Sequence, residues 1–73
     1  MYIETIPQKL RKARLDAGYT QNQTSEITGI PQNNICRYEK GERQPDLETL
    51  CKLIDFYQVS ADWILGTNIK GHK

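Results

Sequence analysis

The sequence predicts an all-α protein, a compact bundle of five short helices. Apolar residues recur at three- and four-residue steps, which place them on one helix face, and no segment alternates apolar and polar residues as a strand does. Glycine and proline punctuate the chain between these helical segments. The 73 residues have room for a single domain, which we place at 1–66, followed by a short polar tail at 67–73.

The first helix is expected over residues 7–17. Leu10, Ala13 and Ala17 share one face at helical spacing, and we expect that face to be buried. Pro7 suits the first turn, because the backbone N–H that proline lacks would have no partner within the helix there. A glycine directly after this segment is typical of a helix end.

Residues 21–40 have the proportions of a helix-turn-helix unit, with one helix over 21–28 and a second over 32–40. Thr20 opens a capping-box pattern that fixes the start of the first of these helices. Gly29 supplies, in the tight turn between them, a residue that readily adopts positive φ. The second helix has apolar residues on one face and an amide-rich opposite face.

The last two helices are expected over 47–57 and 61–65. Asp46 and Ser60 precede them, and both residue types accept hydrogen bonds from the free backbone N–H groups of a first helical turn. In the longer helix, Leu47 begins the row of apolar residues that we expect to face the core.

Composition argues against several classes of protein. Ten Lys and Arg against nine Asp and Glu give a net charge of +1, so bulk charge alone does not indicate nucleic acid. Two Cys and one His cannot supply a four-ligand zinc site, and we expect no metal and no cofactor. No nucleophile–base pair or glycine-rich phosphate loop is visible, which argues against an enzyme. Without a leader pattern or an apolar stretch of ~18 residues, a cytoplasmic protein that does not cross a membrane is expected.

Six short motifs follow one another between residues 6 and 66: Leu10-x-x-x-Arg14, Gly18-Tyr-Thr-Gln21, Gly29-Ile30, Ile35-x-Arg37-Tyr38-Glu39-x-Gly41, Pro45-Asp46-Leu47-x-x-Leu50 and Val59-Ser60-x-Asp62-Trp63-x-Leu65-Gly66. In order and spacing they resemble the phage-repressor and Cro-like helix-turn-helix family, often called the Xre family. The resemblance implies the lambda-repressor-like fold and a domain that binds double-stranded DNA. The sequence departs from the family at Gln58, where glycine is common, and at Thr24 and Thr28, where larger apolar residues are usual.

The polar face of the helix at 32–40 carries the candidate base-contacting residues Gln32, Asn33, Asn34 and Arg37. A side-chain amide pairs with adenine N6 and N7, and a guanidinium pairs with guanine O6 and N7. Gln32 and Asn33 lie in the first turn, the part that such domains point at base edges, and Arg37 lies one turn on, where it reads a base or holds a phosphate. The alternative is that these are solvated polar residues.

Three residues are candidates for contacts to DNA phosphates. Gln21 matches a family glutamine whose amide meets a backbone phosphate and braces the first residue of the recognition helix. The N-terminus of its own helix adds free N–H groups. Lys40 and Arg43 flank the recognition helix, although generic surface charge is an equal alternative for Arg43.

The resemblance implies a different role for Arg14 and Glu39. Both occupy family positions at which an arginine of the first helix and a glutamate of the third form a largely buried ion pair. Such a pair is expected to stabilise the fold and not to contact DNA.

The last helix is the expected dimer interface. Trp63, Ile64 and Leu65 are three large apolar residues in a very short helix, and they cannot all face one small core. We expect Trp63 and Leu65 mainly inside and Ile64 partly exposed at a two-fold contact. The alternative is that Ile64 caps the core or covers a neighbouring loop.

The resemblance therefore predicts a transcriptional regulator, a repressor that binds a palindromic operator as a homodimer. The charge distribution agrees with this, since residues 1–45 carry seven Lys and Arg against five Asp and Glu, whereas residues 46–66 carry one against four. The alternative is an antitoxin or adaptor that uses the same fold to bind a toxin or a regulatory protein.

Overall fold

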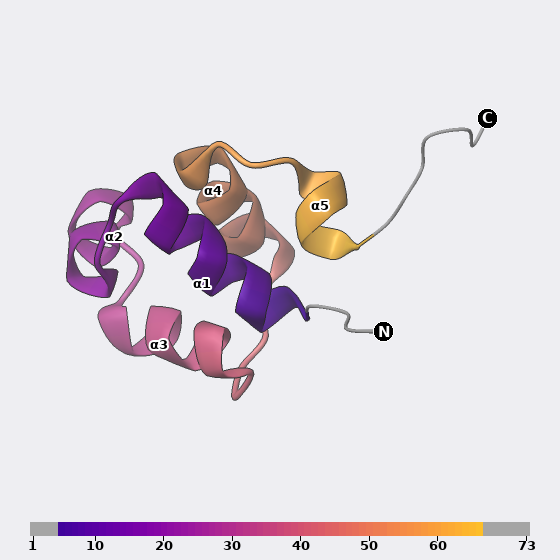
Figure 1. The fold of residues 1–73 in the computed structure, drawn as a ribbon. Helices are drawn as coiled ribbons and strands as arrows, with labels where there is room; N and C mark the ends of the chain where they lie inside the picture. The colour runs from indigo at the N-terminus through magenta and orange to yellow at the C-terminus, as the bar shows by residue number, and fades with distance from the viewer. Residues whose placement is uncertain (1–4, 67–73) are drawn as a thin grey trace.

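The computed structural model describes residues 5–66, and all regular secondary structure within this range is α-helical (Figure 1). The predicted all-α fold is confirmed there, and the predicted tail at 67–73 lies outside the described residues. The five helices are α1 (Ile6–Ala17), α2 (Gln21–Thr28), α3 (Gln32–Lys40), α4 (Leu47–Tyr57) and α5 (Ala61–Leu65). Four of them have the predicted bounds, and α1 begins one residue earlier than expected.

Capping boxes start the first two helices. Thr5 Oγ1 accepts from the Gln8 backbone N–H at 3.5 Å, and Gln8 Oε1 accepts from the Thr5 N–H at 2.9 Å. This box, which was not foreseen, is the reason that α1 begins at Ile6. The predicted box at α2 is confirmed, with the corresponding distances between Thr20 and Gln23 at 3.0 and 2.9 Å. Each box satisfies backbone N–H groups that have no partner within the helix.

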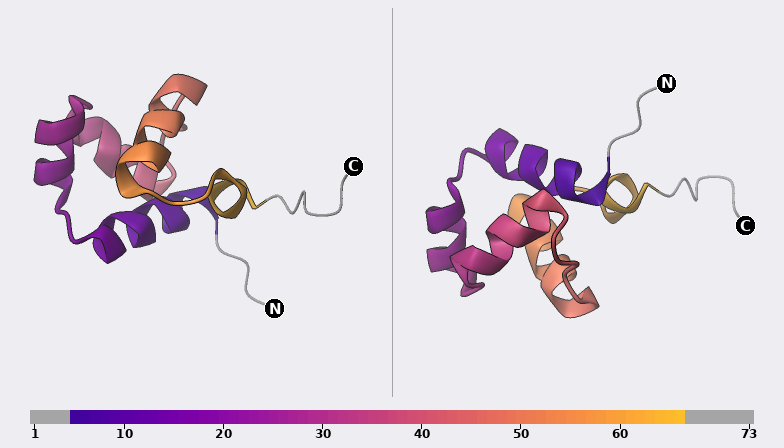
Figure 2. Two further views of the ribbon diagram at one scale, coloured as in Figure 1. Left: turned by 90° about the horizontal axis from the view of Figure 1, so that it is seen from above. Right: turned by 90° about the horizontal axis from the view of Figure 1, so that it is seen from below.

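The helices pack around one core, with α1 in contact with α3, α4 and α5. The helices α2 and α5 lie at opposite ends of the molecule (Figures 1 and 2). The buried apolar residues come from every helix except α2, together with one from the turn between α2 and α3: Leu10, Ala13, Ile30, Ile35, Tyr38, Leu50, Leu53, Tyr57 and Ile64.

In α1 and α4, two residues expected in the core are exposed. Leu47 is 76% exposed, because it occupies the first turn of α4, which projects beyond the other helices (Figure 2). Ala17 lies in the last turn of α1 and is exposed as well. In both α1 and α4, the row of apolar residues is longer than the part of the helix that neighbouring helices cover.

The orientation of α5 is the reverse of the predicted one. Ile64 is fully buried at 0% exposure, whereas Leu65 is 46% exposed and Trp63 is half-buried. The reason is that α5 packs against both α1 and α4, and its rotation points residue 64 between them. Ile64 therefore belongs to the core of its own protomer, as in the alternative that it caps the core, and the expectation that it is partly exposed is wrong.

One helix ends on a residue that is not glycine. Gln58 follows α4 with φ of 58°, in the left-handed region, and its N–H donates to the carbonyls of Ile54 and Asp55. This is the family position at which glycine is common. A side chain with a Cβ is strained in this conformation, so Gln58 ends α4 at some cost in free energy.

Candidate nucleic-acid interface

The angle between α2 and α3 is set by a turn whose centre is buried. Gly29 has φ of 81°, and its N–H donates to the Ser25 carbonyl at 2.9 Å. Ile30 follows at 6% exposure, and Ile35, in the first turns of α3, is 1% exposed. These two isoleucines fill the inside of the angle, as the helix-turn-helix proportions predict, and they leave the far side of α3 to solvent.

The threonines of α2 use their hydroxyl groups within the unit. Thr24 is fully buried, and its Oγ1 donates to the Thr20 carbonyl at 3.0 Å. Thr28 Oγ1 donates to the Thr24 carbonyl at 2.7 Å and accepts from the Ile30 N–H at 3.2 Å. These bonds explain why polar residues are tolerated where the family has apolar ones, since a buried hydroxyl with a partner costs little.

The exposed face of α3 carries three of the predicted DNA-contacting residues. Asn33, Arg37 and Lys40 are all exposed, and their steps of four and three residues align them in one stripe. Gln32 and Asn34 are half-buried, and at 100° per residue they lie on opposite flanks of that stripe. The helix thus presents a face with Asn33 at its centre and one amide at each side.

Behind α3, Arg14 and Glu39 form the expected ion pair. Arg14 Nε donates to Glu39 Oε2 at 2.7 Å, and Nη2 donates to Oε1 at 3.0 Å, so the contact is bidentate. The two side chains are 8% and 4% exposed. The hydrogen bond to Glu39 raises the pKa of Arg14 above its ordinary range, outweighing the opposing effect of burial.

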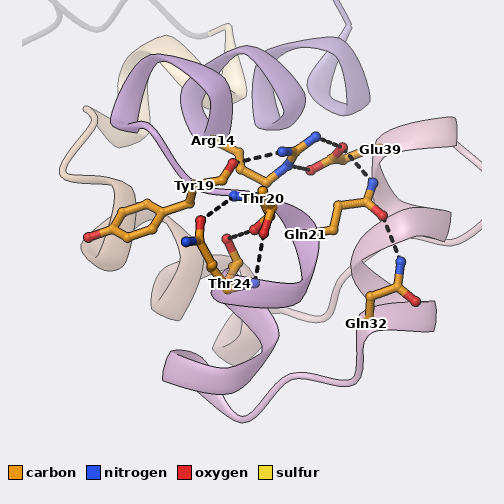
Figure 3. A network of polar contacts seen from close by, with 8 residues as sticks. Arg14, Tyr19, Thr20, Gln21, Thr24, Gln32 and Glu39 are labelled. Carbon is orange, nitrogen blue, oxygen red and sulfur yellow. Dashed lines mark hydrogen bonds and ion pairs between the residues drawn. The ribbon is translucent and has the colours of Figure 1, made fainter.

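The ion pair continues into a chain of amide hydrogen bonds (Figure 3). Gln21 Nε2, at the start of α2, donates to Glu39 Oε1 at 3.0 Å. Gln32 Nε2, at the start of α3, donates to Gln21 Oε1 at 2.7 Å. The expectation that Gln21 braces the first residue of the recognition helix is therefore confirmed, and the brace is itself anchored on Glu39.

The direction of each amide in this chain follows from chemistry. A carboxylate only accepts hydrogen bonds, so Gln21 must turn its nitrogen toward Glu39 and its oxygen toward Gln32. Gln32 then donates one N–H to Gln21. The Oε1 and the second N–H of Gln32 take no part in these hydrogen bonds. One acceptor beside one donor is the complement of the N6–H donor and N7 acceptor of adenine.

Two contacts of this site were not predicted from the sequence. The Tyr19 backbone carbonyl accepts from Arg14 Nη1 at 2.8 Å and holds a third position of the guanidinium. A backbone acceptor leaves no trace in residue identity. The Gln21–Glu39 contact was also missed, although a glutamine at the start of α2 and an acidic residue late in α3 are visible in the sequence.

Lys40 and Arg43 lie near the C-terminal end of α3, and both are exposed. Arg43 borders a cleft of about 250 Å³ between the start of α1 and the loop from α3 to α4. These cations lie at the opposite end of α3 from Gln32. The exposed face of α3 therefore has positive charge at its C-terminal end, from Lys40 and Arg43. At its other end lies the N-terminus of α2, with its free N–H groups.

Within residues 5–66, no group of three or more His, Cys, Asp or Glu residues could hold a metal ion. None of the helices described is long and apolar enough to cross a bilayer.

The fold and the site together define a helix-turn-helix domain. Residues 10–64 match the helix-turn-helix family, and the chain belongs to that family, with the features of its phage-repressor and Cro-like (Xre) members.

Similar curated proteins are named as regulators. The HTH-type transcriptional regulator ImmR of Bacillus subtilis (strain 168) is 44% identical over 62 residues, which cover 85% of this chain and 49% of the relative. The SPbeta prophage-derived uncharacterized regulator YonR of the same organism is 39% identical, over 84% of this chain and 57% of the relative. The cryptic phage CTXphi transcriptional repressor RstR of Vibrio cholerae is 37% identical, over 70% and 46%. The chain thus spans about half the length of these relatives.

Proposed function

We propose that this chain is a sequence-specific DNA-binding domain that places α3 in the major groove and acts in transcriptional repression in the cytoplasm. The observation that carries the proposal is the Gln32–Gln21 hydrogen bond of 2.7 Å, which holds a base-reading amide in one direction. A merely solvated glutamine would have no such support. The names of the relatives, regulators in two cases and a repressor in a third, favour the same function.

In this proposal, the residues on the exposed face of α3 contact different bases. Gln32 pairs with an adenine, and Asn33 and Arg37 reach neighbouring base edges from the centre of the stripe. Asn34 reads the groove from the opposite flank. Since these side chains lie on one rigid helix, their spacing selects bases within a few consecutive pairs.

The phosphate contacts position the helix in the groove. Gln21 retains one N–H of its amide beyond its bond to Glu39, and the N-terminus of α2 presents free backbone N–H groups beside it. Lys40 and Arg43 contact the phosphate backbone at the other end of α3. Such contacts fix register and carry no sequence information of their own.

We propose further that two copies bind a palindromic operator. One recognition helix reads only a few base pairs, and a two-fold dimer doubles the site. Because Ile64 is enclosed in its own protomer, the contact between copies uses residues other than Ile64. A dimer on an operator that overlaps a promoter would then exclude RNA polymerase.

The test is selection of bound sites from random double-stranded DNA. The expected result is an enriched palindrome with an adenine-dependent position in each half-site. Gln32→Ala should lower affinity for the selected site by about 1–3 kcal/mol and relax preference at that position alone, with little change on random DNA. Enrichment of no sequence, or equal losses on both DNAs, contradicts the proposal.

A further inference from the structure

The hydrogen bonds that lead from the ion pair to Gln32 all run in one direction. Gln32 donates to Gln21 at 2.7 Å, Gln21 donates to Glu39 at 3.0 Å, and Arg14 donates to both oxygens of Glu39 (Figure 3). Every donor therefore points toward Glu39, the only anion in the chain of contacts. Because a carboxylate cannot donate, this residue sets the direction of both amides.

Reversing that direction would change what Gln32 offers to DNA. If Gln21 faced a donor at position 39, it would turn its oxygen toward that donor and its nitrogen toward Gln32. Gln32 would then accept with Oε1 and present N–H groups outward. Donors alone match the N7 and O6 acceptors of guanine, whereas a donor beside an acceptor matches adenine.

Burial of the ion pair prevents the Gln21 amide from turning over. The Glu39 side chain is 4% exposed and that of Arg14 is 8% exposed, and Gln21 and Gln32 are half-buried. Water therefore has little access to the carboxylate, and a flipped Gln21 amide would set its oxygen against a buried anion. Such a contact is strongly unfavourable where screening is weak.

We propose that the Arg14–Glu39 ion pair is a positioning element for DNA recognition, through which Glu39 commits Gln32 to adenine at one base pair of each half-site. The inference rests on the proposed function and extends it, because it assigns a part in sequence preference to two residues that do not touch DNA. A pair with a purely structural role would leave base preference unchanged in any variant that folds.

The main test is the charge-reversed double variant Arg14→Glu/Glu39→Arg, which keeps opposite charges but places a donor beside Gln21. Site selection is compared with the wild type at the position whose preference is lost in Gln32→Ala. The wild type should prefer adenine over guanine there by about tenfold, as one bidentate contact provides. The folded variant should lose that preference in favour of guanine. An unchanged preference for adenine would overturn the proposal.

A second variant decides the matter if circular dichroism shows that the reversed pair does not fold. Gln21→Met removes both amide bonds and leaves the ion pair itself intact. It should lose most of the tenfold adenine preference at that one position, in addition to a uniform loss from its phosphate contact. Lys40→Ala is the control, since it should lower affinity and keep the preference. Full adenine preference in Gln21→Met would refute the proposal that Glu39 acts on Gln32 through Gln21.

Failure of this inference is distinguishable from failure of the proposed function. A wild-type chain that enriches no sequence contradicts sequence-specific binding altogether. A wild-type chain with a clear adenine position, retained in the folded variants, contradicts only the role of Glu39.

Discussion

Lys9 joins α1 to α5 through Trp63. Its Nζ donates to the Trp63 carbonyl at 2.8 Å and lies 5.9 Å from the centre of the indole ring. The carbonyl belongs to the last turn of α5, where it also accepts from the Gly66 N–H at 3.3 Å. A cation at this end opposes the negative end of the helix dipole. Lys9 thus adds a polar contact to the apolar packing of Ile64, which sets α5 against α1 and α4.

Replacing Lys9 by methionine should loosen α5. The change keeps most of the aliphatic stem but removes the hydrogen bond and the charge, and we expect a loss of about 1 kcal/mol in the free energy of unfolding. Trp63 is the single tryptophan, so its fluorescence reports on α5 directly. The emission should shift to the red below the temperature of global unfolding. Lys12→Met on the same helix is the control, and equal spectra for the two variants would contradict the role given to Lys9.

Removing Arg14 should be far more costly. In Arg14→Ala the Glu39 carboxylate stays buried without its partner, and such stranded charges cost about 3–5 kcal/mol. A domain of 73 residues has a total stability of about 4–11 kcal/mol, so the variant should lose a large part of it and melt at a markedly lower temperature than the wild type. Thermal unfolding followed by circular dichroism measures this.

The matched control breaks the exposed pair of Lys12 and Asp16, which lie 3.7 Å apart with side chains 53% and 68% exposed. Lys12→Ala should change the unfolding free energy by less than about 0.5 kcal/mol, because solvent screens exposed pairs. Equal losses of unfolding free energy in Arg14→Ala and Lys12→Ala would show that the buried pair stabilises the fold no more than the exposed one.

Gln58→Gly should stabilise the protein. Gln58 has φ of 58°, a conformation that glycine adopts without the clash of a Cβ, and relief of this strain is worth about 1 kcal/mol. The melting temperature should rise by several degrees, about 4–8 °C per kcal/mol in a domain of this size. Gln58→Ala, which removes the amide and keeps the Cβ, should give no such gain.

Lys40→Ala should weaken binding to all DNA sequences alike. If Lys40 contacts one phosphate, its loss lowers the slope of log affinity against log salt by about 0.9. Fluorescence anisotropy at several salt concentrations measures that slope. Lys52→Ala removes the same charge from α4, on the acidic part of the chain, and should leave the slope unchanged. The assignment fails if both variants behave alike.

Local chemistry explains why the helices could be predicted. Thr20, Asp46 and Ser60 each accept a hydrogen bond from a backbone N–H three residues on, and these bonds depend only on neighbouring residues. The capping box formed by Thr5 and Gln8 was not predicted, and the first residue of α1 was therefore missed. Where the residue that caps the first turn was identified, at Thr20, Asp46 and Ser60, the helix bounds were correct.

Packing decided what sequence could not. A helix of five residues has no periodicity from which to infer its rotation, so Ile64 and Leu65 were assigned to the wrong sides. Leu47 continues the apolar row of α4, but no other helix reaches it. At the site, the ion pair and the brace on Gln32 were expected from the family, whereas the contact of Gln21 with Glu39 depends on how α2 and α3 meet.

Because Ile64 is buried within its own protomer, the protomer can fold without pairing with a second copy. A protomer that completes its own core has no need of a second copy to become ordered, so its melting temperature should not depend on protein concentration. Pairing would then be free to be weak in solution and strong on DNA, where both half-sites hold the copies together. If two copies bind one operator as proposed, its occupancy would rise with the square of the concentration of the free chain, and a modest change in expression would act as a sharp switch.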